Sequence, residues 1–312
     1  MKYLLGVDGG GTKTDSVLCE QNGKVVRRCI GGASSMTGQT EEKAYQNIRE
    51  TVWSVLGDID QSDVLGVYVG ISGGGLEKNK ARYRAMLDDF LSNVKNRANG
   101  SDAVNALSSG IGPGDGIIAI AGTGSSVFAR NNGEMYQVGG WGYLLGDEGS
   151  GYDLGRRALT ASLKELDGRG QKTVLSAMCE KKAGCPLREL VAQLYRTDSK
   201  LAIASYARIL MEAAEQGDAA ALKELHEAAD DMAYAIQTAA GKCRRRGVVM
   251  GGSVWKNALY RRLVSEKLGS SYEMIFPTLP PVYGSVVEAA GLAGITVNEK
   301  FKQSFMDTLK EV

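Results

Sequence analysis

Short apolar runs that end in glycine-rich segments recur along this chain of 312 residues. The run from Leu4 to Val7 ends at Asp8 and three consecutive glycines, and residues 15–21 form a second run that ends at Asn22-Gly23. Apolar runs of this length predict buried strands, and an Asn-Gly dipeptide predicts a hairpin turn. The glycines therefore join one strand to the next, and a third strand is expected at residues 24–28.

The glycine-rich tip at residues 8–14, DGGGTKT, is compared with three kinds of turn. A P-loop has Gly directly before Lys, whereas Thr12 separates Gly11 from Lys13 here. A Rossmann loop opens a helix, whereas a strand follows this loop. What remains is a hairpin tip, which is either only a tight turn or an anion site with Asp8 placed to hold a cation. The anion contacts would then come from Gly9, Gly10, Gly11, Thr12, Lys13 and Thr14.

Strands and helices alternate over the following residues. Thr40 can cap a helix whose apolar face extends to Val55, and residues 65–71 form a continuous apolar run of strand length. An amphipathic helix is expected around residues 81–91, and a helix start at Ser101-Asp102 follows a weak strand. This order predicts an α/β domain with a sheet between helices.

The opening pattern returns at residue 116, where an apolar strand leads to the tip Gly122-Thr-Gly-Ser125 and then to a second strand. An Asn-Gly turn again ends that strand, so an internal duplication is the economical explanation. The turn cluster at residues 112–115 marks the boundary. The predicted domains are residues 1–114 and 115–312, with the terminal helix at 298–312 able to pack back on the first domain.

The second half is predicted to be rich in helices, with a third glycine break. Residues 248–250 read as a short buried strand, and Gly251-Gly-Ser-Val-Trp255 follows it and admits another ligand. A strand at 272–276 and a small-residue helix at 286–295 come next. Helical spacing is found at 152–166, 172–182, 187–195, 201–215 and 219–243.

Charge and length narrow the classes of partner. The net charge is +1, from 37 basic and 36 acidic residues, so no global field favours nucleic acid or an anionic membrane. No stretch reaches the length of a transmembrane helix, and we expect a cytoplasmic protein with a small local ligand.

Cysteine and histidine usage limits the chemistry. The five cysteines lack CxxC spacing, which favours reduced thiols over a disulfide framework or a zinc or iron–sulfur site. The single histidine, His226, lies in a helical run and is expected on its surface. Carboxylates are therefore the default acid–base groups.

The order of the three glycine-rich segments, each directly after an apolar strand, resembles the sugar kinase, actin and heat-shock chaperone superfamily. Its first phosphate, second phosphate and adenosine segments are similar to VDGGGTKT, IAGTGSS and VMGGSVW. The stretch VGGWGYLLGDEGSGYDLG at 138–155 further resembles the N-acetylglucosamine kinase branch, which includes ATPases that activate benzoyl-CoA reductase. The resemblance covers essentially the whole chain. It implies an α/β fold of two duplicated ribonuclease H-like domains, the actin-like ATPase fold, flanking an ATP cleft.

The resemblance also implies roles for residues at matching positions. Asp102 would be the catalytic carboxylate that accepts the proton of the attacking sugar hydroxyl, and Asp8 would orient Mg²⁺. Without the resemblance, Asp102 reads as an ordinary first-turn aspartate and Trp141 as a core residue. The second phosphate contacts would be Thr123, Gly124 and Ser125, the nucleoside contacts Ala214, Gly251, Gly252 and Ser253, and the sugar contacts Gly140, Trp141 and Asp147.

One position departs from the family pattern. The sugar-contacting loop usually has an Asn after a small-Ser pair, and here Ser35, or Met36 with a one-residue slip, stands there. A serine leaves more room near the ring hydroxyls. We therefore hypothesise that a 3-O-substituted sugar such as N-acetylmuramic acid is accepted beside N-acetylglucosamine.

The expected function is ATP-dependent phosphorylation of an N-acetylated amino sugar, with ATP and Mg²⁺ as cofactors and a homodimer as a compatible assembly. One alternative is an ATPase activator of a radical dehydratase or reductase, for which Cys179 and Cys185 would have to be forced into cluster ligation. Another is a non-catalytic sugar-binding regulator, against which the presence of both Asp8 and Asp102 argues.

Overall fold

The chain begins with three strands joined by tight turns. The structure, a computed structural model, describes residues 1–35 and 39–312. Strand β1 (Tyr3–Gly9) pairs antiparallel with β2 (Thr14–Glu20), and β2 pairs antiparallel with β3 (Val25–Gly31). The glycine-rich residues form the turn between β1 and β2, so the predicted hairpin is confirmed.

These strands belong to the first of two units into which the chain divides, formed by Met1–Gly114 and Phe276–Val312. Its sheet has the order β3-β2-β1-β4-β5, with β4 parallel to both β1 and β5. The other elements of this unit are α1 (Glu41–Leu56), η1 (Gln61–Asp63), β4 (Val64–Ile71), α2 (Glu77–Phe90), β5 (Arg97–Ser101), α3 (Asp102–Ile111), α11 (Pro281–Leu292) and α12 (Glu299–Thr308).

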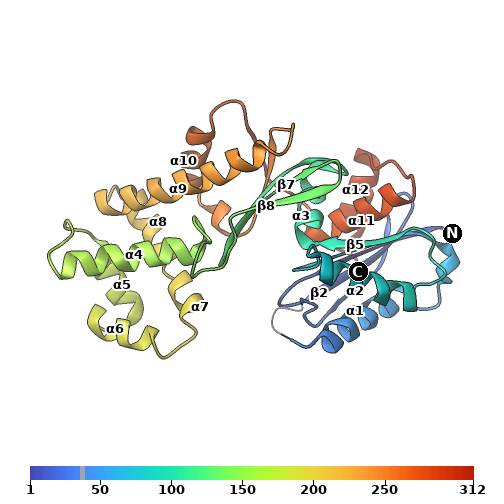
Figure 1. The fold of residues 1–312 in the computed structure, drawn as a ribbon, viewed down its shortest axis with the longest axis horizontal. Coiled ribbons are helices and arrows are strands. Elements are labelled where there is room, and N and C mark those ends of the chain that lie inside the picture. Colours follow the sequence, from blue (N-terminus) through green and yellow to red (C-terminus); the bar gives the residue numbers. More distant parts are fainter. Residues whose placement is uncertain (36–38) are drawn as a thin grey trace. The chain divides into compact units, whose positions relative to one another are not determined.

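Helices cover both faces of the first sheet (Figure 1). Leu5 and Val7 of β1 point to one face and join a buried cluster with Ile48 and Val52 of α1. On the opposite face, α11 approaches β1 so closely that a Cβ on Gly6 would lie 2.6 Å from the hydroxyl of Ser285. Burial on both faces explains why β1 is a continuous apolar run rather than an alternating one.

The segment that returns to the first unit is longer than the terminal helix expected at 298–312. It starts at Phe276 and includes α11, which packs against β1, β4 and α3. Small residues permit this packing: a Cβ on Gly284 of α11 would overlap the carbonyl oxygen of Asn105 in α3. Helix α11 therefore forms part of the first core, so the second unit ends at Ile275 and not at residue 312.

The second unit consists of Asp115–Ile275, and its sheet has the order β10-β9-β6-β7-β8. Strands β6, β7 and β8 are an antiparallel meander, and β9 lies parallel to β6. Its elements are β6 (Gly116–Ala121), β7 (Ser125–Asn131), β8 (Glu134–Val138), α4 (Gly151–Leu166), α5 (Leu175–Ala183), α6 (Leu187–Leu194), α7 (Ser199–Ala204), α8 (Ala207–Glu215), α9 (Ala219–Ala240), β9 (Gly247–Gly251), η2 (Val254–Lys256), α10 (Ala258–Leu268) and β10 (Glu273–Ile275).

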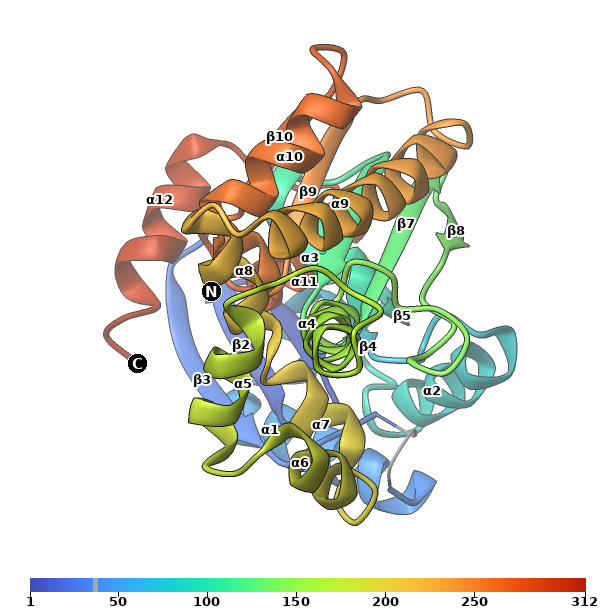
Figure 2. The same cartoon turned by 90° about the vertical axis from the view of Figure 1, so that its left-hand side faces the viewer.

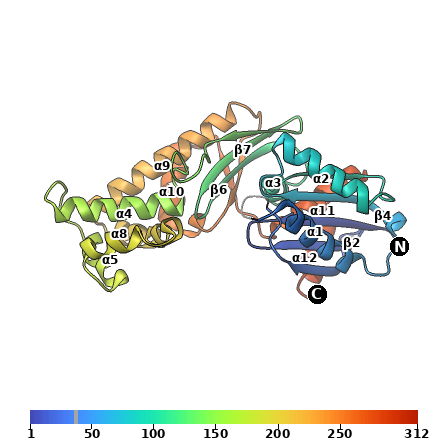
Figure 3. The same ribbon diagram turned by 60° about the horizontal axis from the view of Figure 1, so that its bottom comes forward.

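The two sheets share one topology, in agreement with the predicted duplication. Strands β1 to β5 occupy the same places in the first sheet as β6 to β10 occupy in the second. The second unit differs in its helices. Helix α9 contacts β6, β7 and β8 (Figure 2), and α4, α5 and α8 pack on one another (Figure 3).

Several helices depart from the expected bounds, among them α11, which begins at Pro281 rather than at Val286. Helix α2 starts at Glu77 rather than near Ala81. The helix expected at 201–215 is divided into α7 and α8, because the backbone bonds at the break connect residues three apart, from Tyr206 N–H to Ile203 O (2.9 Å) and from Ile209 N–H to Tyr206 O (3.0 Å). Burial of the Tyr206 ring accompanies this tightening, which periodicity along the chain does not reveal.

The structure also bears on the expected chemistry. All five cysteines are free, and Cys19, Cys179 and Cys243 are buried. Within residues 1–35 and 39–312, no group of three or more His, Cys, Asp or Glu side chains is arranged to hold a metal ion. None of the helices in these same residues has the length and apolar character that a membrane span requires.

The contact between α3 and α11 can be tested at one glycine. We expect Gly284→Ala to lower the free energy of unfolding by about 1–3 kcal/mol, because its Cβ overlaps the backbone of α3. Gly291 lies in the same helix, and a Cβ there would have no neighbouring atom within 4 Å, so Gly291→Ala is the matched control and should be neutral or slightly stabilising. Urea denaturation of both variants makes the measurement, and equal stabilities would contradict the packing argument.

Candidate active site

The parallel strands of the first sheet bring three polar residues to one edge. Gly9 of β1 is in register with Ile71 of β4, and Ile71 is in register with Ser101 of β5. Because the carboxyl ends of parallel strands meet at the same edge, Asp8, Ser72 and Asp102 gather there. The Ser72 N–H donates to Gly9 O over 2.8 Å and fixes the loop after β4 to β1.

Asp102 is the first residue of α3, as the sequence predicted. The Ser101 hydroxyl caps the helix by accepting from the Ala103 N–H (3.2 Å), and it donates to Asp102 Oδ1 (3.1 Å). Burial raises the pKa of Asp102, although hydrogen bonds from Ser101, the Ala103 backbone and Ser72 oppose the rise. A carboxylate with a raised pKa is a stronger proton acceptor than an exposed aspartate.

Asp8 is held by a side chain of α3. The Asn105 amide donates to Asp8 Oδ1 (2.8 Å) and also lies 3.3 Å from Val7 O and 3.2 Å from Gly70 O. Burial raises the pKa of Asp8 to about 6; the bond from Asn105 opposes this rise, and the nearby charge of Asp102 adds to it. The two carboxylates are therefore near enough to influence each other.

This edge of the sheet has the donors that suit a hard cation. Mg²⁺ prefers oxygen ligands and is commonly bound through one or two carboxylates, waters and substrate phosphates. Asp8 supplies a half-buried carboxylate, and the buried Oδ1 of Asn105 has no hydrogen-bond partner among the described residues. Asp8, with Asp102 beside it, fits the Mg²⁺ role that the sequence suggested.

Only part of the tip of the β1–β2 hairpin is exposed to solvent. Its turn is closed by a bond from Gly10 N–H to Lys13 O (2.9 Å), and Gly11, Thr12 and Lys13 are exposed. Thr14 is buried, and its hydroxyl donates to Gly32 O over 2.7 Å. Thr14 thus fastens the neighbouring loop, while Gly11 and Thr12 are exposed and the Lys13 ammonium lies 3.5 Å from Asp15 Oδ2.

That neighbouring loop carries the position at which the family motif differs. The N–H groups of Ser34 and Ser35 both donate to Gly10 O, over 3.0 and 3.2 Å, so the loop is tied directly to the β1–β2 hairpin. Ser35 is buried. Met36, the other candidate for this position, lies outside the described residues.

The second glycine-rich tip, at residues 122–125, is attached to the start of α4. Gly151 N–H donates to Gly122 O (2.7 Å), and Tyr152 N–H donates to Thr123 O (3.0 Å). The buried Ser125 hydroxyl donates to Glu148 O over 2.7 Å and is therefore engaged within the protein. Thr123 is exposed and is the side chain of this tip most accessible to a phosphate.

The predicted sugar residues Gly140, Trp141 and Asp147 lie on one loop of the second unit. Trp141 is 70% exposed, so the interpretation as a core residue is wrong and its face is available to a ligand. Asp147 is only 4% exposed and accepts a bond from Gly142 N–H over 3.2 Å. Its φ of 62° is unusual for a residue other than glycine, which indicates that surrounding contacts impose its conformation.

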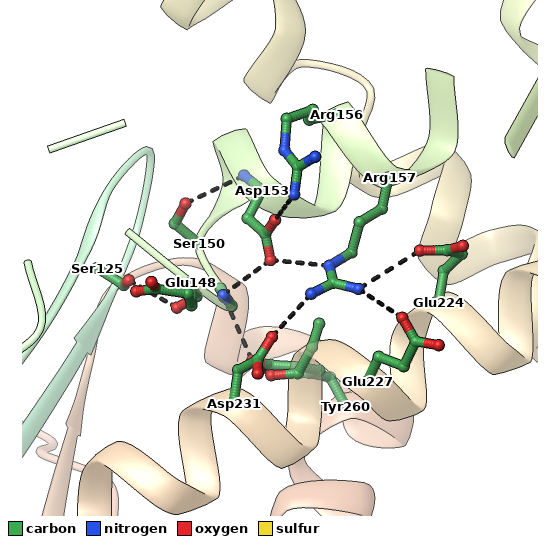
Figure 4. A network of polar contacts seen from close by, with 12 residues as sticks. Ser125, Glu148, Ser150, Asp153, Arg156, Arg157, Glu224, Glu227, Asp231 and Tyr260 are labelled. Carbon is green, nitrogen blue, oxygen red and sulfur yellow. Dashed lines mark hydrogen bonds and ion pairs between the residues drawn. The ribbon is translucent and has the colours of Figure 1, made fainter. Parts of the chain in front are cut away.

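A charged network fixes the segment that follows Asp147 (Figure 4). Asp153 accepts from Gly149 N–H (3.0 Å) and from Arg157 Nε (2.9 Å), while Tyr260 donates to Gly149 O (3.3 Å). Arg157 is itself surrounded by the carboxylates of Asp153, Glu224, Glu227 and Asp231. The network anchors residues 149–153, and these residues in turn hold the second glycine-rich tip, at residues 122–125.

A cavity of about 1110 Å³ lies within the second unit, beside this tip. Its volume is sufficient for a nucleotide. Gly122 and Thr123 line one part, Met211 and Glu215 of α8 another, and Ser253 a third. The remaining lining residues include both charged and polar groups, among them Lys181, Lys182, Arg208, Glu212, Lys256 and Asn257.

The predicted nucleoside residues surround this cavity unequally. Ser253 lines it, whereas Ala214 is only 3% exposed and packs into the core behind it. Gly251 and Gly252 precede Ser253, and Gly252 has a φ of 104° and no room for a Cβ beside Ala121 O. The expected segments thus reach the cavity, while other side chains on α8 and η2 form its surface.

Several residues of this region are not marked by the motifs of the sequence. Asn105 could have been found, because it lies three residues after Asp102 and therefore on the same face of α3. Lys200 has no comparable signal: its ammonium lies 3.5 Å from Asp147 Oδ2, although 53 residues separate the two. Arg157 likewise follows no motif, and only the packing of α4 on α9 reveals its partners.

The fold and the three glycine-rich segments define an ATPase of the actin-like, sugar kinase class. The family model of the BadF/BadG/BcrA/BcrD ATPase family matches residues 5–289, and the chain belongs to this family.

Relatives with sequence identity of 30% or more are sugar kinases. The chain is 34% identical over 245 residues to an N-acetylmuramic acid/N-acetylglucosamine kinase of Clostridium acetobutylicum, covering 76% of this chain and 79% of that protein. It is 30% identical over 311 residues to an N-acetyl-D-glucosamine kinase of Dictyostelium discoideum, covering 92% and 98%.

Solved structures agree on the fold. A Chromobacterium violaceum protein provisionally named an N-acetylglucosamine kinase is 26% identical, with a TM-score of 0.69 and coverage of 94% of this chain and 99% of that one. A glucokinase of the ROK family from Streptomyces griseus, in complex with glucose and AMPPNP, has a TM-score of 0.54 at 17% identity, covering 92% and 98%. At this identity the second likeness concerns the fold alone.

The raised pKa of Asp8 predicts a pH-dependent stability. Its folded value of about 6 lies above the ordinary 3.8, so the stability present below pH 4 is lost as the pH rises through 6. Asp8→Asn removes this loss. We expect the ligand-free variant to gain up to roughly 3 kcal/mol over wild type between pH 4 and pH 7.5.

Chemical denaturation of both proteins without Mg²⁺ or ATP at these two pH values measures the gain. Asp89→Asn, an exposed aspartate on α2, is the control and should show no comparable dependence. The same Asp8→Asn difference at both pH values would contradict burial as the cause.

Proposed function

We propose that this chain is an ATP-dependent kinase that phosphorylates N-acetylated amino sugars, N-acetylglucosamine foremost and N-acetylmuramic acid with it. The observation that carries the proposal is the pair of desolvated carboxylates, Asp8 and Asp102, at the edge of a sheet built like those of sugar kinases. The names of the relatives from Clostridium acetobutylicum and Dictyostelium discoideum support the choice of an amino sugar.

In the proposed reaction Asp102 accepts the proton of one sugar hydroxyl. The hydroxyl oxygen forms a bond to the γ-phosphorus as the bond from that phosphorus to the β-bridging oxygen breaks, and ADP leaves. The raised pKa of Asp102 suits this role, because a stronger base transfers the proton more readily. The burial that destabilises the Asp102 carboxylate thereby makes this group a better proton acceptor.

Contacts for ATP and Mg²⁺ are proposed for each unit by itself. The backbone and side chains of Gly11, Thr12 and Lys13 in the first unit, and Thr123 in the second, are the exposed phosphate contacts. Asp8 would hold Mg²⁺, which neutralises charge on the phosphates when bound. The nucleoside would occupy the 1110 Å³ cavity of the second unit.

Sugar contacts are proposed for each unit by itself: the exposed Trp141 ring and Asp147 in the second unit, and the loop of Ser35 in the first. An aromatic face covers the apolar side of a pyranose, and a carboxylate accepts hydroxyl hydrogen bonds. Ser35 is smaller than the asparagine of the family pattern, and its N–H is used by Gly10 O. The space gained at this position would admit the 3-O-substituent of a muramic sugar.

A phosphorus NMR assay tests the function. Wild-type protein with ATP and Mg²⁺ should form a phosphate ester with N-acetylglucosamine and N-acetylmuramic acid in preference to glucosamine or glucose, and the spectrum also identifies the phosphorylated hydroxyl. ATP hydrolysis without any sugar ester would refute the proposal. It would favour the alternative of an ATPase activator, for which anaerobically purified protein should be brown.

Removal of the proposed base gives a second prediction. We expect Asp102→Asn to lower kcat by a factor of about 10²–10⁴, because the variant keeps the shape of the side chain and loses the proton acceptor. ATP binding, measured by calorimetry, should persist. Asp307→Asn, exposed on α12, is the control, and turnover by Asp102→Asn at the wild-type rate would show that another group is the base.

The substrate hypothesis can be tested at Ser35. Ser35→Asn should lower kcat/KM for N-acetylmuramic acid by more than about tenfold and affect N-acetylglucosamine less, because the amide fills space that the 3-O-substituent needs. Ser35→Ala keeps this space and should leave the preference as in wild type. An unchanged ratio in Ser35→Asn, or no phosphorylation of the muramic sugar by wild type, would rule the hypothesis out.

A further inference from the structure

A buried carboxylate lies directly against the second phosphate tip. If Gly124 carried a Cβ, that atom would lie 2.7 Å from Asp147 Oδ2. Asp147 is 4% exposed, so water screens its charge poorly. An isolated carboxylate at this place would repel the phosphates that the tip is proposed to bind.

Lys200 supplies the opposite charge. Its Nζ lies 3.5 Å from Asp147 Oδ2, and it would lie 3.6 Å from a Cβ on Gly124. The ammonium therefore reaches the same point of the phosphate tip as the carboxylate does. Both groups come from outside the tip, Asp147 from the loop before α4 and Lys200 from α7.

Aromatic contacts hold the ammonium in this position. Lys200 Nζ lies 5.4 Å from the centre of the Tyr143 ring, a cation–π distance. Tyr143 packs edge-on against Tyr152, with the ring centres 5.1 Å apart, and the Tyr152 N–H bonds to Thr123 O. Lys200 is thus connected to the phosphate tip on two sides.

Helix stability does not account for this lysine. Lys200 is the second residue of α7, and the helix dipole disfavours a cation in the first turn. The Asp198 cap already accepts from the Lys200 N–H over 3.2 Å, so the backbone at this end is satisfied without the ammonium. The charge is better explained by its partner than by its own helix.

We propose that Lys200 is a positioning residue of the kinase, whose ammonium holds Asp147 against Gly124 and cancels its charge so that the second tip can accept ATP phosphates. The inference rests on the proposed function, and it adds a residue that no motif marks. Asp147 remains available to the sugar only while its charge does not oppose the nucleotide. Lys200 thereby makes the buried Asp147 carboxylate compatible with both substrates.

A charge-cancellation cycle tests the proposal. In calorimetry without sugar, Lys200→Met should weaken binding of ATP-Mg²⁺ at least tenfold, because it leaves Asp147 uncompensated. The double variant Asp147→Asn/Lys200→Met should recover binding to within about threefold of wild type, since both charges are gone. Lys200→Arg should rescue the single loss, and Lys200→Gln serves as a second neutral variant if Lys200→Met does not fold.

The matched control is a second lysine–aspartate pair of the same unit. Lys267 Nζ of α10 lies 2.5 Å from Asp230 Oδ1 of α9, and neither residue lines the cavity, so Lys267→Met should leave ATP affinity unchanged. Wild-type affinity in folded Lys200→Met, or a double variant no better than the single one, would overturn the proposal. Failure of wild type to phosphorylate any sugar would overturn the proposed function alone, because the cycle measures only ATP binding.

Discussion

The Asn105 side-chain amide is the contact on which the first unit's site depends. It joins α3 to the carboxyl ends of two strands, through Val7 O, Gly70 O and the Asp8 carboxylate. Neither carboxylate could be held in this arrangement by the sheet alone, because Asp8 belongs to β1 and Asp102 to a helix after β5. The absence of a Cβ on Gly284 lets α11 press on the backbone of the same asparagine. Packing and polar geometry are thus coupled at one residue.

In the second unit, different contacts hold the glycine-rich tip and the loop beside it. Its sheet repeats the topology of the first, yet ionic contacts rather than a neutral amide anchor residues 149–153, whose backbone N–H groups hold the glycine-rich tip at 122–125. Arg157 anchors the turn that leads into α4, and Lys200 holds Asp147. Buried ion pairs contribute little net stability and are costly to break singly, so a role in positioning explains them better than a role in stability.

The sequence predicted well what is determined locally. The hairpin at Gly9 to Thr14, the duplicated strands and the placement of Asp102 at a helix start follow from apolar runs, glycines and an N-cap serine, all of which act over a few residues. The break before Tyr206 and the long return of α11 did not follow, because they arise from packing between segments far apart in the chain. Ala214 illustrates the same limit: periodicity locates α8 but does not say which of its faces meets the cavity, and Ala214 packs into the core.

Both units contain carboxylates that burial has largely removed from water. Asp8 and Asp102 have raised pKa values because burial removes the water that would stabilise their charges. Asp147 is also buried, but the Lys200 ammonium lies beside it. Asp147 belongs to the loop proposed to bind the sugar, and no part in proton transfer is proposed for it. The contacts of these carboxylates match their proposed roles: Asp102 accepts a hydrogen bond from the Ser101 hydroxyl, whereas the Lys200 ammonium lies beside Asp147. The Lys200 ion pair therefore separates Asp147 from the two carboxylates at the edge of the first sheet, although burial affects all three.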